Sequence, residues 1–460
     1  MIMKIVVLVK IVDGEVNIFD QSALESALGI EGAEVTVVSM CPPGAAEKLK
    51  SLTRLGVERV ILLSDAGYAG SDTLATSYII SKALKKLDYD LIFCGRQTTD
   101  GDTAQVGPCL SAMLGIGLIT NVMRINCIDK SVNCDTRIGN ETVNFPALLT
   151  FERINTLRFP SIRSKTKDIE IWDNSVVDAD LSLCGIGGSP TKVLKVYEKK
   201  NDRRKCKFIN VGELLPLIES LMSVQRTESV SGERNIKLKS VWAIGSKVMD
   251  KALEIAEDVV LISETDPFKI AELARREKPD VILWNADLWG RRNAPIVSAI
   301  LHTGLCADCT YLETDGHKLY MYRPAKSGNI TAKIECGTLP QMATVRTVQP
   351  SNDIIVSAGR GAADMFDAVK RFASSINAEV CASRGLVDTG IAPYDMQVGL
   401  TGKSVSPRIY IAVGISGAVH HTVGIENAET VIAINPDKNA RIFEYSDYGI
   451  VAGADIINTI

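Results

Sequence analysis

The stretch DIIVSAGRGAADMFDAVKRFASSI, residues 353–376, combines an apolar run of strand length, a Gly-x-Gly turn and a segment whose apolar residues recur with a helical period. A strand, a glycine turn and a helix in this order are typical of parallel α/β sheets, and they bring backbone amides and a helix N-terminus to a place where a phosphate can bind. The third glycine of the dinucleotide fingerprint is missing, because Asp364 occupies its position. The next apolar run, AEVCA (378–382), is followed by Ser383 and Arg384 rather than by an acid that would bind a ribose. The stretch therefore predicts a nucleotide-binding type of fold and disfavours an ordinary nicotinamide site.

Polar, glycine-bearing loops recur after the apolar runs that follow. They are YDMQVGLTGK (394–403), RIYIAVGISGAVHHT (408–422) and VIAINPD (431–437). Open parallel sheets place their ligands at such positions, beyond the carboxyl ends of the strands. Together with ASRGLVD (382–388) and DYGIVAG (447–453), these segments closely resemble the FAD-binding domain of the electron transfer flavoprotein alpha subunit. The resemblance implies a Rossmann-like, doubly wound FAD-binding domain.

The resemblance also implies a role for individual residues of this domain. Arg384 would lie against the isoalloxazine edge, Thr401 would hydrogen-bond the redox-active ring nitrogen, and His421 would face the pyrimidine carbonyl. The resemblance implies further cofactor contacts, some made by backbone amides and some to the pyrophosphate and to the ribityl or adenosine part. The residues concerned are Arg360, Ser383, Gln397, Val398, Gly399, Ser416, Gly417, Ala418, Asn435 and Asp447. Leu400, where the family often has glutamine, and Gly453, where it often has aspartate, depart from the pattern.

Composition narrows the class of protein. The 460 residues suffice for two to four domains, and the formal net charge of −4 without a polybasic tail indicates neither nucleic acid nor a membrane surface as a partner. No segment approaches the roughly 20 apolar residues of a membrane helix, and MIMKIVVLVK (1–10) is interpreted as a first buried strand rather than a signal peptide.

The 11 cysteines are odd in number and scattered, which predicts reduced thiols and a cytoplasmic protein. Cys306 and Cys309 form a C-x-x-C pair, and we favour a packing role for it over a redox or metal role, because no second pair completes a zinc site.

The N-terminal part of the chain alternates strands and helices from KIVVLVK (4–10) to YDLIFCG (89–95), as a right-handed parallel sheet requires. The polar loop RQTTDGDTAQVGP (96–108) follows and leads into a helix. It suits a nucleotide, with ribose contacts from Asp100 or Asp102 and backbone amides from Thr103, Ala104, Gln105, Val106 and Gly107. A turn that merely caps the helix explains the same residues equally well.

Residues 1–225 resemble the beta subunit of electron transfer flavoprotein, in LVK, SDAGYAGSDTLATS, CGRQTTDGDTAQVGP, FPALLTFERIN and GGSPTKVLKVY. In that family the DGDTAQVGP loop binds AMP in simple carriers, or a second FAD in the electron-bifurcating branch, which draws electrons from NADH. The segment 64–77 and Arg96 are more similar to the bifurcating branch. RFPSIR (158–163) stands where the family docks partner dehydrogenases, and Ile162 would be the anchor, although an ordinary edge loop explains this stretch equally well.

An internal repeat follows the turn-rich stretches NDRR (201–204) and RTESVSGER (226–234). REKPDVILWN (276–285) resembles KKLDYDLIFCG (85–95), with Asp280 equivalent to Asp90, and LPQMATVR echoes FPALLTFER. The second copy of the loop, NADLWGRRNAP (285–295), lacks the DGDT pattern, so we expect it to be structural. The resulting prediction is an α/β protein with two pseudo-symmetric nucleotide-binding-like lobes, within residues 1–225 and 226–348, and an FAD-binding domain at residues 349–460.

The resemblance covers nearly the whole chain and implies an electron transfer flavoprotein with the beta and alpha subunits fused. Such a protein would carry electrons through FAD between NADH or acyl-CoA dehydrogenase-type partners and ferredoxin or flavodoxin acceptors, with NADH-dependent oxidoreductase activity if it bifurcates electrons. A simple carrier with one FAD and one AMP is the near alternative. A nucleotide-binding or sensing protein without redox turnover is the alternative from another class.

Overall fold

The computed structural model describes residues 2–198, 204–223, 237–325, 330–349 and 351–460. The chain forms two compact units. Unit 1 contains the described residues up to 197 and those in 237–325 and 332–345. Unit 2 contains residues 198, 204–223 and 330–331 and the described residues from 346 onward. Most of the two turn-rich stretches at 201–204 and 226–234 lies outside the described residues.

The first lobe of unit 1 is a nine-stranded sheet in the order β11-β5-β4-β1-β6-β10-β7-β8-β9. The pairs from β11 to β7 are parallel, and β8 and β9 extend the sheet in antiparallel fashion. The strands are β1 (Met3–Leu8), β4 (Ala33–Met40), β5 (Arg59–Leu63), β6 (Leu91–Gly95), β7 (Gly117–Ile128), β8 (Ser131–Thr136), β9 (Gly139–Asn144), β10 (Ala147–Phe151) and β11 (Glu170–Trp172). A small hairpin joins β2 (Ile11–Val12) to β3 (Glu15–Val16).

Helices cover both faces of this sheet. Residues of α1 (Ile18–Leu28) and α2 (Ala46–Leu52) pack in one apolar core, and residues of α3 (Thr73–Leu84) and α4 (Val106–Leu114) pack in the other. The central strands are runs of Val, Ile and Leu that are buried on both faces, as parallel strands between two helical layers must be. The short helices α5 (Asn174–Val177) and α6 (Gly185–Gly188) follow β11. The alternation predicted from the sequence is confirmed, and α4 begins three residues earlier than expected.

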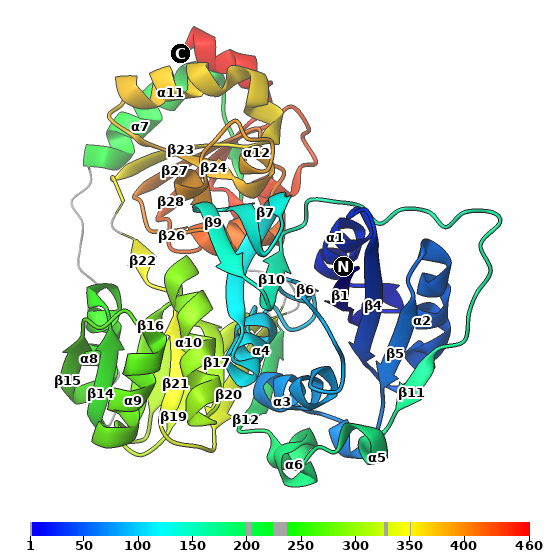
Figure 1. Ribbon diagram of the computed structural model, residues 1–460. Coiled ribbons are helices and arrows are strands. Elements are labelled where there is room, and N and C mark those ends of the chain that lie inside the picture. Colours follow the sequence, from blue (N-terminus) through cyan, green and yellow to red (C-terminus); the bar gives the residue numbers. More distant parts are fainter. Residues whose placement is uncertain (1, 199–203, 224–236, 326–329, 350) are drawn as a thin grey trace. The chain divides into compact units, whose positions relative to one another are not determined.

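The second lobe of unit 1 is a five-stranded parallel sheet in the order β15-β14-β16-β21-β17. Its strands and helices are β14 (Leu238–Ile244), α8 (Met249–Ile255), β15 (Ala256–Ile262), α9 (Pro267–Glu277), β16 (Val281–Asn285), α10 (Leu288–Leu301), β17 (Leu305–Cys309) and β21 (Gln341–Val345). A four-stranded sheet lies beside it and consists of β12 (Thr191–Glu198), β20 (Ile330–Cys336), β19 (Leu319–Ala325) and β18 (Tyr311–Thr314). Helix α4 of the first lobe and α10 of the second are neighbours (Figure 1), and the Cys109 thiol donates to the Pro295 carbonyl.

The internal repeat is visible in the hydrogen bonds of the two lobes. The Asp90 carbonyl accepts from the Ala147 amide, and the Asp280 carbonyl accepts from the Gln341 amide. Near the end of each crossover helix, a serine hydroxyl donates to the backbone carbonyl five residues further along the chain. The distance is 2.8 Å from Ser111 in α4 and 2.6 Å from Ser298 in α10. The equivalence predicted for Asp90 and Asp280 and the two pseudo-symmetric lobes are therefore confirmed.

Unit 2 is a doubly wound parallel sheet of seven strands in the order β13-β29-β28-β27-β23-β24-β25. Its strands are β13 (Lys207–Phe208), β23 (Ile354–Ala358), β24 (Glu379–Ser383), β25 (Gln397–Val398), β27 (Ile409–Val413), β28 (Thr430–Ile434) and β29 (Tyr448–Ile450), and β22 (Val348–Gln349) pairs separately with β26 (Ser404–Val405). Its helices are α7 (Leu214–Ser223), α11 (Phe366–Ser375), α12 (Arg384–Val387) and α13 (Val419–Thr422). Leu214 and Ile218 of α7 are buried in the same core as β23, β27 and α11.

Candidate nucleotide-binding sites

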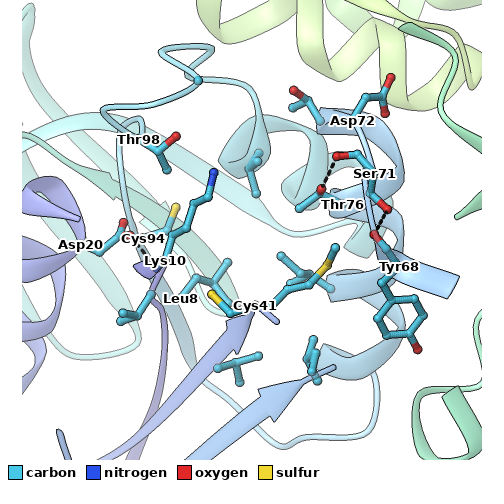
Figure 2. Close-up of a pocket in the computed structure, with 18 of the residues that line it drawn as sticks. Leu8, Lys10, Asp20, Cys41, Tyr68, Ser71, Asp72, Thr76, Cys94 and Thr98 are labelled. Carbon is cyan, nitrogen blue, oxygen red and sulfur yellow. Dashed lines mark hydrogen bonds between the residues drawn. The ribbon is translucent and has the colours of Figure 1, made fainter. Parts of the chain in front are cut away.

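A cavity of about 860 Å³ opens at the carboxyl ends of β1, β4, β5 and β6 in unit 1. Parallel α/β sheets bind their ligands at this edge. The wall is made by the residues that follow these strands, by the first turn of α3 and by the loop 96–105 between β6 and α4. Figure 2 shows Lys10 reaching from the end of β1 toward the loop that carries Thr98, with Cys41 and Cys94 below it. The cavity is large enough for a nucleotide, since ligand pockets run from roughly 300 to 1,000 Å³.

The loop of the predicted second nucleotide site forms one side of this cavity. Thr103, Ala104, Gln105, Val106 and Gly107 all line it. Asp102 and Ala104 have φ angles of 51° and 56°. Such left-handed backbone costs a residue with a Cβ about 1–2 kcal/mol, and strain of this kind is typical of functional loops.

Contacts with the second lobe hold the strained loop in place. The Arg323 guanidinium, on β19, donates to the Asp102 carbonyl at 3.1 Å, and the Gln105 amide donates to the Leu305 carbonyl at 3.1 Å. Within the loop, the Gln97 amide donates to the Asp102 carboxylate at 3.0 Å. The shape of this loop therefore depends on both lobes of unit 1.

The carboxylates that we predicted for ribose contacts are engaged with protein groups. Asp100 forms an ion pair with Lys10 at 2.6 Å. Burial alone would raise the pKa of Asp100, but hydrogen bonds from Lys10, Thr98 and the Gly101 amide outweigh it and hold that pKa below its usual value. Asp100 and Asp102 belong to the loop but not to the lining of the cavity, so their ribose contacts stay a prediction.

Sequence reasoning missed Asp20, a buried carboxylate at the cavity. One of its oxygens accepts from the Lys10 amide at 2.8 Å and the other accepts from the Gly95 amide at 2.9 Å, so it joins the ends of β1 and β6. Burial raises the pKa of Asp20 to about 7, although these hydrogen bonds oppose the shift. The available signal was only an acid in the first turn of a helix that directly follows the first strand and hairpin.

The segment that resembles the bifurcating branch, residues 64–77, forms the opposite wall of the cavity. Its two acids are used as helix caps: Asp65 accepts from the Gly67 amide and Asp72 from the Ala75 amide. Arg96 also lines the cavity, and its buried guanidinium pairs with Glu152 at 3.3 Å.

The equivalent loop in the second lobe has its polar side chains engaged with other protein groups. Asp287 caps α10 by accepting from the Gly290 amide at 2.9 Å, and it also accepts from the Asn285 side chain at 2.7 Å. Arg291 pairs with Asp308 at 2.9 Å, and Arg292 pairs with Glu141 at 2.7 Å. The polar side chains of this second loop are therefore used in contacts within unit 1.

In unit 2, the predicted flavin residues gather at the carboxyl edge of the sheet, with one exception. Ser383 ends β24 and Arg384 follows it, while Val398 ends β25 and Gly399 follows it. Arg360 follows β23, the segment 416–421 follows β27, and Asn435 follows β28. Asp447 instead precedes β29, at the opposite edge, where its carboxylate accepts from the Val431 amide at 2.8 Å and pairs with Arg204. Parallel strands place the residues that follow them at one edge of the sheet and those that precede them at the other, which is why Asp447 is not at the carboxyl edge.

The Gly-x-Gly turn at 359–361 serves backbone packing. The Gly359 amide donates to the Val413 carbonyl at 2.7 Å and the Gly361 amide donates to the Gly414 carbonyl at 3.1 Å. A Cβ at Gly359 would lie 2.2 Å from the Gly414 carbonyl oxygen. These two amides therefore hold the turn to the last residue of β27 and to Gly414, which follows it.

Two buried polar atoms at the carboxyl edge have no hydrogen-bond partner among the described residues of the chain: Gln397 Oε1 and His421 Nδ1. The Gln397 amide nitrogen donates to the Thr401 hydroxyl at 2.7 Å, and His421 Nε2 is 2.9 Å from the Tyr410 hydroxyl. A Cβ at Gly399 would lie 2.4 Å from the His420 carbonyl oxygen, so the loop approaches the α13 segment as closely as only glycine permits. Buried polar atoms without partners are rare in native proteins, so this edge fits a bound polar group such as the flavin ring.

The remaining predicted contacts vary in exposure. Ser416 and Ala418 are exposed, and Gly417 between them has a φ of 84°. Arg384 pairs with Asp388, one helical turn further on, at 3.2 Å. The Asn435 amide donates to the Ile415 carbonyl at 2.9 Å.

The predicted docking loop, residues 158–163 of unit 1, presents two apolar side chains to solvent. Phe159 is 96% exposed and Ile162 is 98% exposed. Arg158, beside them, pairs with Glu25 at 2.9 Å and so fixes the start of the loop to α1. Sequence reasoning named Ile162 and missed Phe159, which the same apolar-in-basic pattern contains.

Several broader properties can be checked on the described residues. Cys306 and Cys309 are buried and are not joined by a disulfide. Across the described ranges, His, Cys, Asp and Glu side chains form no group of three or more that could hold a metal ion. Nor does any helix in the described part of the chain have the length and apolar character that crossing a membrane requires.

Both sheet edges have the features of nucleotide-binding α/β proteins: parallel strands, glycine-bearing loops, and either a cavity or unpartnered buried polar atoms. Known families define the class more narrowly. The family described as "Electron transfer flavoprotein domain" matches residues 5–176 and 245–367, and the one described as "Electron transfer flavoprotein FAD-binding domain" matches residues 350–426. The chain belongs to the electron transfer flavoprotein family, and it carries the FAD-binding domain of that family.

Relatives of both subunit types match this single chain. The electron transfer flavoprotein subunit alpha of Thermoanaerobacterium thermosaccharolyticum is 40% identical over 229 residues, which cover 40% of this chain and 69% of the subunit. Subunit beta of Clostridium acetobutylicum is 39% identical over 197 residues, covering 40% of this chain and 76% of the subunit. Protein FixA of Azorhizobium caulinodans is 37% identical over 224 residues, covering 44% and 79%. Beta-like and alpha-like parts are thus fused in one polypeptide.

Proposed function

We propose that this chain transfers electrons with two flavins, one FAD at the carboxyl edge of unit 2 and a second FAD in the cavity of unit 1, and that it bifurcates electrons from NADH. The donor side also includes acyl-CoA dehydrogenase-type flavoenzymes, and the acceptors are ferredoxin or flavodoxin. The observation that carries the proposal is the cavity of about 860 Å³ in unit 1, formed by a strained loop, in a chain whose FAD-binding domain is a separate unit.

At the unit 2 site, the residues that would hold FAD are those that follow the strands. Bound there, FAD supplies hydride and single-electron chemistry. His421 and Gln397 contribute the two buried polar atoms that lack a partner, Thr401 contributes a hydroxyl that Gln397 orients, and Arg384 contributes a fixed positive charge. Fixed donors and charges act strongly in a dry site, so they set the electron affinity of the group they face.

At the unit 1 site, the size of the cavity favours FAD over AMP. Its volume is near the upper end of the usual range for ligand pockets, roughly 300–1,000 Å³, which exceeds the need of a mononucleotide. The loop supplies backbone amides from Thr103 to Gly107 at the start of α4, where the helix dipole favours a phosphate. Lys10 adds a cation on the same side. A simple carrier would hold AMP in the same place.

The first experiment is the content of FAD and AMP per chain after reconstitution with excess FAD. Two FAD and no AMP would support the proposal, whereas one FAD with one AMP would establish the simple carrier and end the NADH claim. The variant Thr76→Trp, which places a large side chain in the cavity wall on α3, should remove one nucleotide per chain and leave the other. Lys86→Trp, just beyond the same helix at an exposed position, is the matched control and should keep both.

Partner docking is proposed to use the exposed pair Phe159 and Ile162. An apolar anchor inside a charged rim is the usual arrangement of a small interface. With an acyl-CoA dehydrogenase as electron donor, Ile162→Asp should raise the KM for the dehydrogenase on the order of tenfold and leave FAD content unchanged. Phe268→Asp, at an exposed apolar side chain of α9, should leave that KM unchanged. An equal KM in both variants would contradict docking at Ile162.

The alternative from another class is a nucleotide-binding or sensing protein without redox turnover. It would be supported by protein that stays colourless after reconstitution and still binds AMP. The cytoplasmic location expected from the thiol pattern remains a prediction, with which the free cysteines of the described residues agree.

A further inference from the structure

Tyr410 lies behind His421, on the side of the ring that faces the core of unit 2. It is on β27 and is fully buried, and its hydroxyl is 2.9 Å from His421 Nε2. His421 is itself only 5% exposed. A tyrosine hydroxyl that is buried this completely has to place its proton on an acceptor, because an unmade hydrogen bond costs about 1–3 kcal/mol in such surroundings.

Burial keeps both groups neutral, which limits how they can pair. It lowers the pKa of His421 to about 4 and raises that of Tyr410 well above its usual value. A neutral imidazole has one protonated nitrogen and one acceptor nitrogen. The Ser357 hydroxyl also lies near the Tyr410 hydroxyl, but it makes no hydrogen bond of normal geometry among the described residues, so His421 Nε2 is the acceptor of better geometry. If Tyr410 donates to Nε2, the proton of the ring has to be on Nδ1.

The other ring nitrogen is the one without a partner. His421 Nδ1 is buried and makes no hydrogen bond of normal geometry among the described residues, although the Val398 carbonyl is close enough to favour a proton on the ring. A protonated Nδ1 is a donor, which is what an acceptor such as a flavin carbonyl requires.

We infer that Tyr410 is a positioning residue: its hydroxyl donates to His421 Nε2 and thereby fixes the tautomer in which Nδ1–H is the donor toward the flavin. The inference rests on the proposed function for the partner of Nδ1, but the tautomer belongs to the protein itself and is measurable without FAD. A phenylalanine at this position would fill nearly the same volume and leave the ring free to protonate Nε2 instead.

The experiment is nitrogen NMR of histidine-labelled protein, with Tyr410→Phe compared with wild type, each with and without FAD. The wild type should show one neutral ring with Nδ1 protonated at neutral pH, assigned to His421 by its loss in His421→Gln. In Tyr410→Phe that signature should shift toward the other tautomer. Tyr448→Phe, which removes a phenol at the amino edge of the same sheet, should leave it unchanged.

A second measurement separates the inference from the proposed function. FAD affinity should fall on the order of tenfold in Tyr410→Phe, the equivalent of one lost hydrogen bond of about 1.4 kcal/mol. If FAD binds and shifts the His421 signals, but both proteins have the same tautomer, the role of Tyr410 is refuted and the flavin site stands. If FAD leaves the His421 signals unchanged while Tyr410→Phe changes the tautomer, the flavin contact fails and the positioning of the ring stands. A wild type with Nε2 protonated would also overturn the inference.

Discussion

The two lobes of unit 1 contain the same strand and helix joined in two different ways. In the first lobe ten residues, 96–105, connect β6 to α4, whereas in the second only two, 286 and 287, connect β16 to α10. Ser111 and Ser298 mark equivalent positions, so α10 starts five residues before the equivalent of the first residue of α4. Those added residues occupy the place where the first lobe has its loop.

The difference shows how a repeated fold can have a long, cavity-bordering loop in one copy and a short connection in the other. The long loop has two residues with left-handed backbone and borders a cavity. Asp287 of the short connection caps α10. Gly290, in the first turn of that helix, packs directly on the end of the preceding strand, β16. Backbone strain accompanies the loop that borders the cavity, and tight helix packing accompanies the short connection.

The largest effect is expected at Gly290. A Cβ there would lie 1.9 Å from the Asn285 carbonyl oxygen, which is backbone and cannot turn away. Gly290→Ala should therefore lower the free energy of unfolding of unit 1 by about 3 kcal/mol or more. Urea unfolding followed by tryptophan fluorescence measures this, because all four tryptophans, at 172, 242, 284 and 289, are in unit 1.

Gly187→Ala is the control, since a Cβ there meets nothing within 4 Å. Where Gly290→Ala remains folded, its nucleotide content should equal that of wild type. Loss of one nucleotide from the folded variant would show that the short connection takes part in binding, which would break the comparison.

A pH-dependent effect is expected from Asp20, under the long loop. Its pKa is about 7 in the folded protein, whereas an aspartate free in water has an ordinary pKa of 3.8, so between these values the folded state holds a proton that the unfolded state has lost. The stability of unit 1 should therefore fall as the pH rises from about 4 to 7, by at most about 1.4 kcal/mol per pH unit from this group. The free energy of unfolding of the wild type minus that of Asp20→Asn, measured at several pH values in this range, isolates the contribution of Asp20. A difference that does not change with pH would contradict the raised pKa.

The two lobes offer a matched pair of lysines for testing nucleotide binding. Lys10 pairs with Asp100 at the long loop, and Lys247 pairs with Asp287 at the short connection. Lys10→Met should weaken the binding of AMP, used as the probe, on the order of tenfold, because a cation near a phosphate contributes about 1.5 kcal/mol. Lys247→Met should leave it unchanged in equilibrium titrations. Equal losses in both variants would mean that only long-range charge matters.

The smallest effect is expected from relief of strain in the long loop. Ala104 has a φ of 56°, which glycine adopts without cost, so Ala104→Gly should raise the free energy of unfolding by up to about 1 kcal/mol. Ala286→Gly, in the short connection, should not raise it, because Ala286 has no left-handed backbone to relieve. A stabilisation of both variants would show that strain does not distinguish the two loops.

The fold could be predicted largely from the sequence, because hydrophobic period and glycine turns act locally. The doubly wound sheet of unit 2 and the repeat of Asp90 in Asp280 both follow from patterns within single segments. The helix after Gly361 was expected to be continuous, and the structure instead has a 3₁₀ segment, Arg360–Met365, before α11. Ala362 has non-helical backbone there, next to the loop after β27, which is a tertiary contact that local pattern does not contain.

The candidate sites could be predicted less completely, because they depend on which edge of a sheet a residue reaches and on what already binds it. Asp447 adjoins a strand of the FAD-binding domain, yet it precedes that strand and pairs with Arg204, more than two hundred positions away in sequence. Asp20 has the pattern of an ordinary helical acid until the ends of β1 and β6 are placed beside it. Tyr410 has the pattern of one more apolar residue in a buried strand.

Helix α7 belongs to the core of unit 2, although six of the seven strands of its sheet follow it in the sequence, from β23 at Ile354 onward. On the ribosome, α7 therefore emerges long before its partner strands exist. At 5–20 residues per second, the 237 residues between the end of α7 and residue 460 take roughly 10–50 s to synthesise. Until β23 and β27 are made within that interval, Leu214 and Ile218 lack the strands that cover them, so the nascent chain carries an uncovered apolar helix that chaperones can bind. Joining the two subunit types in one gene thus gives this chain a long, vulnerable period during its own production.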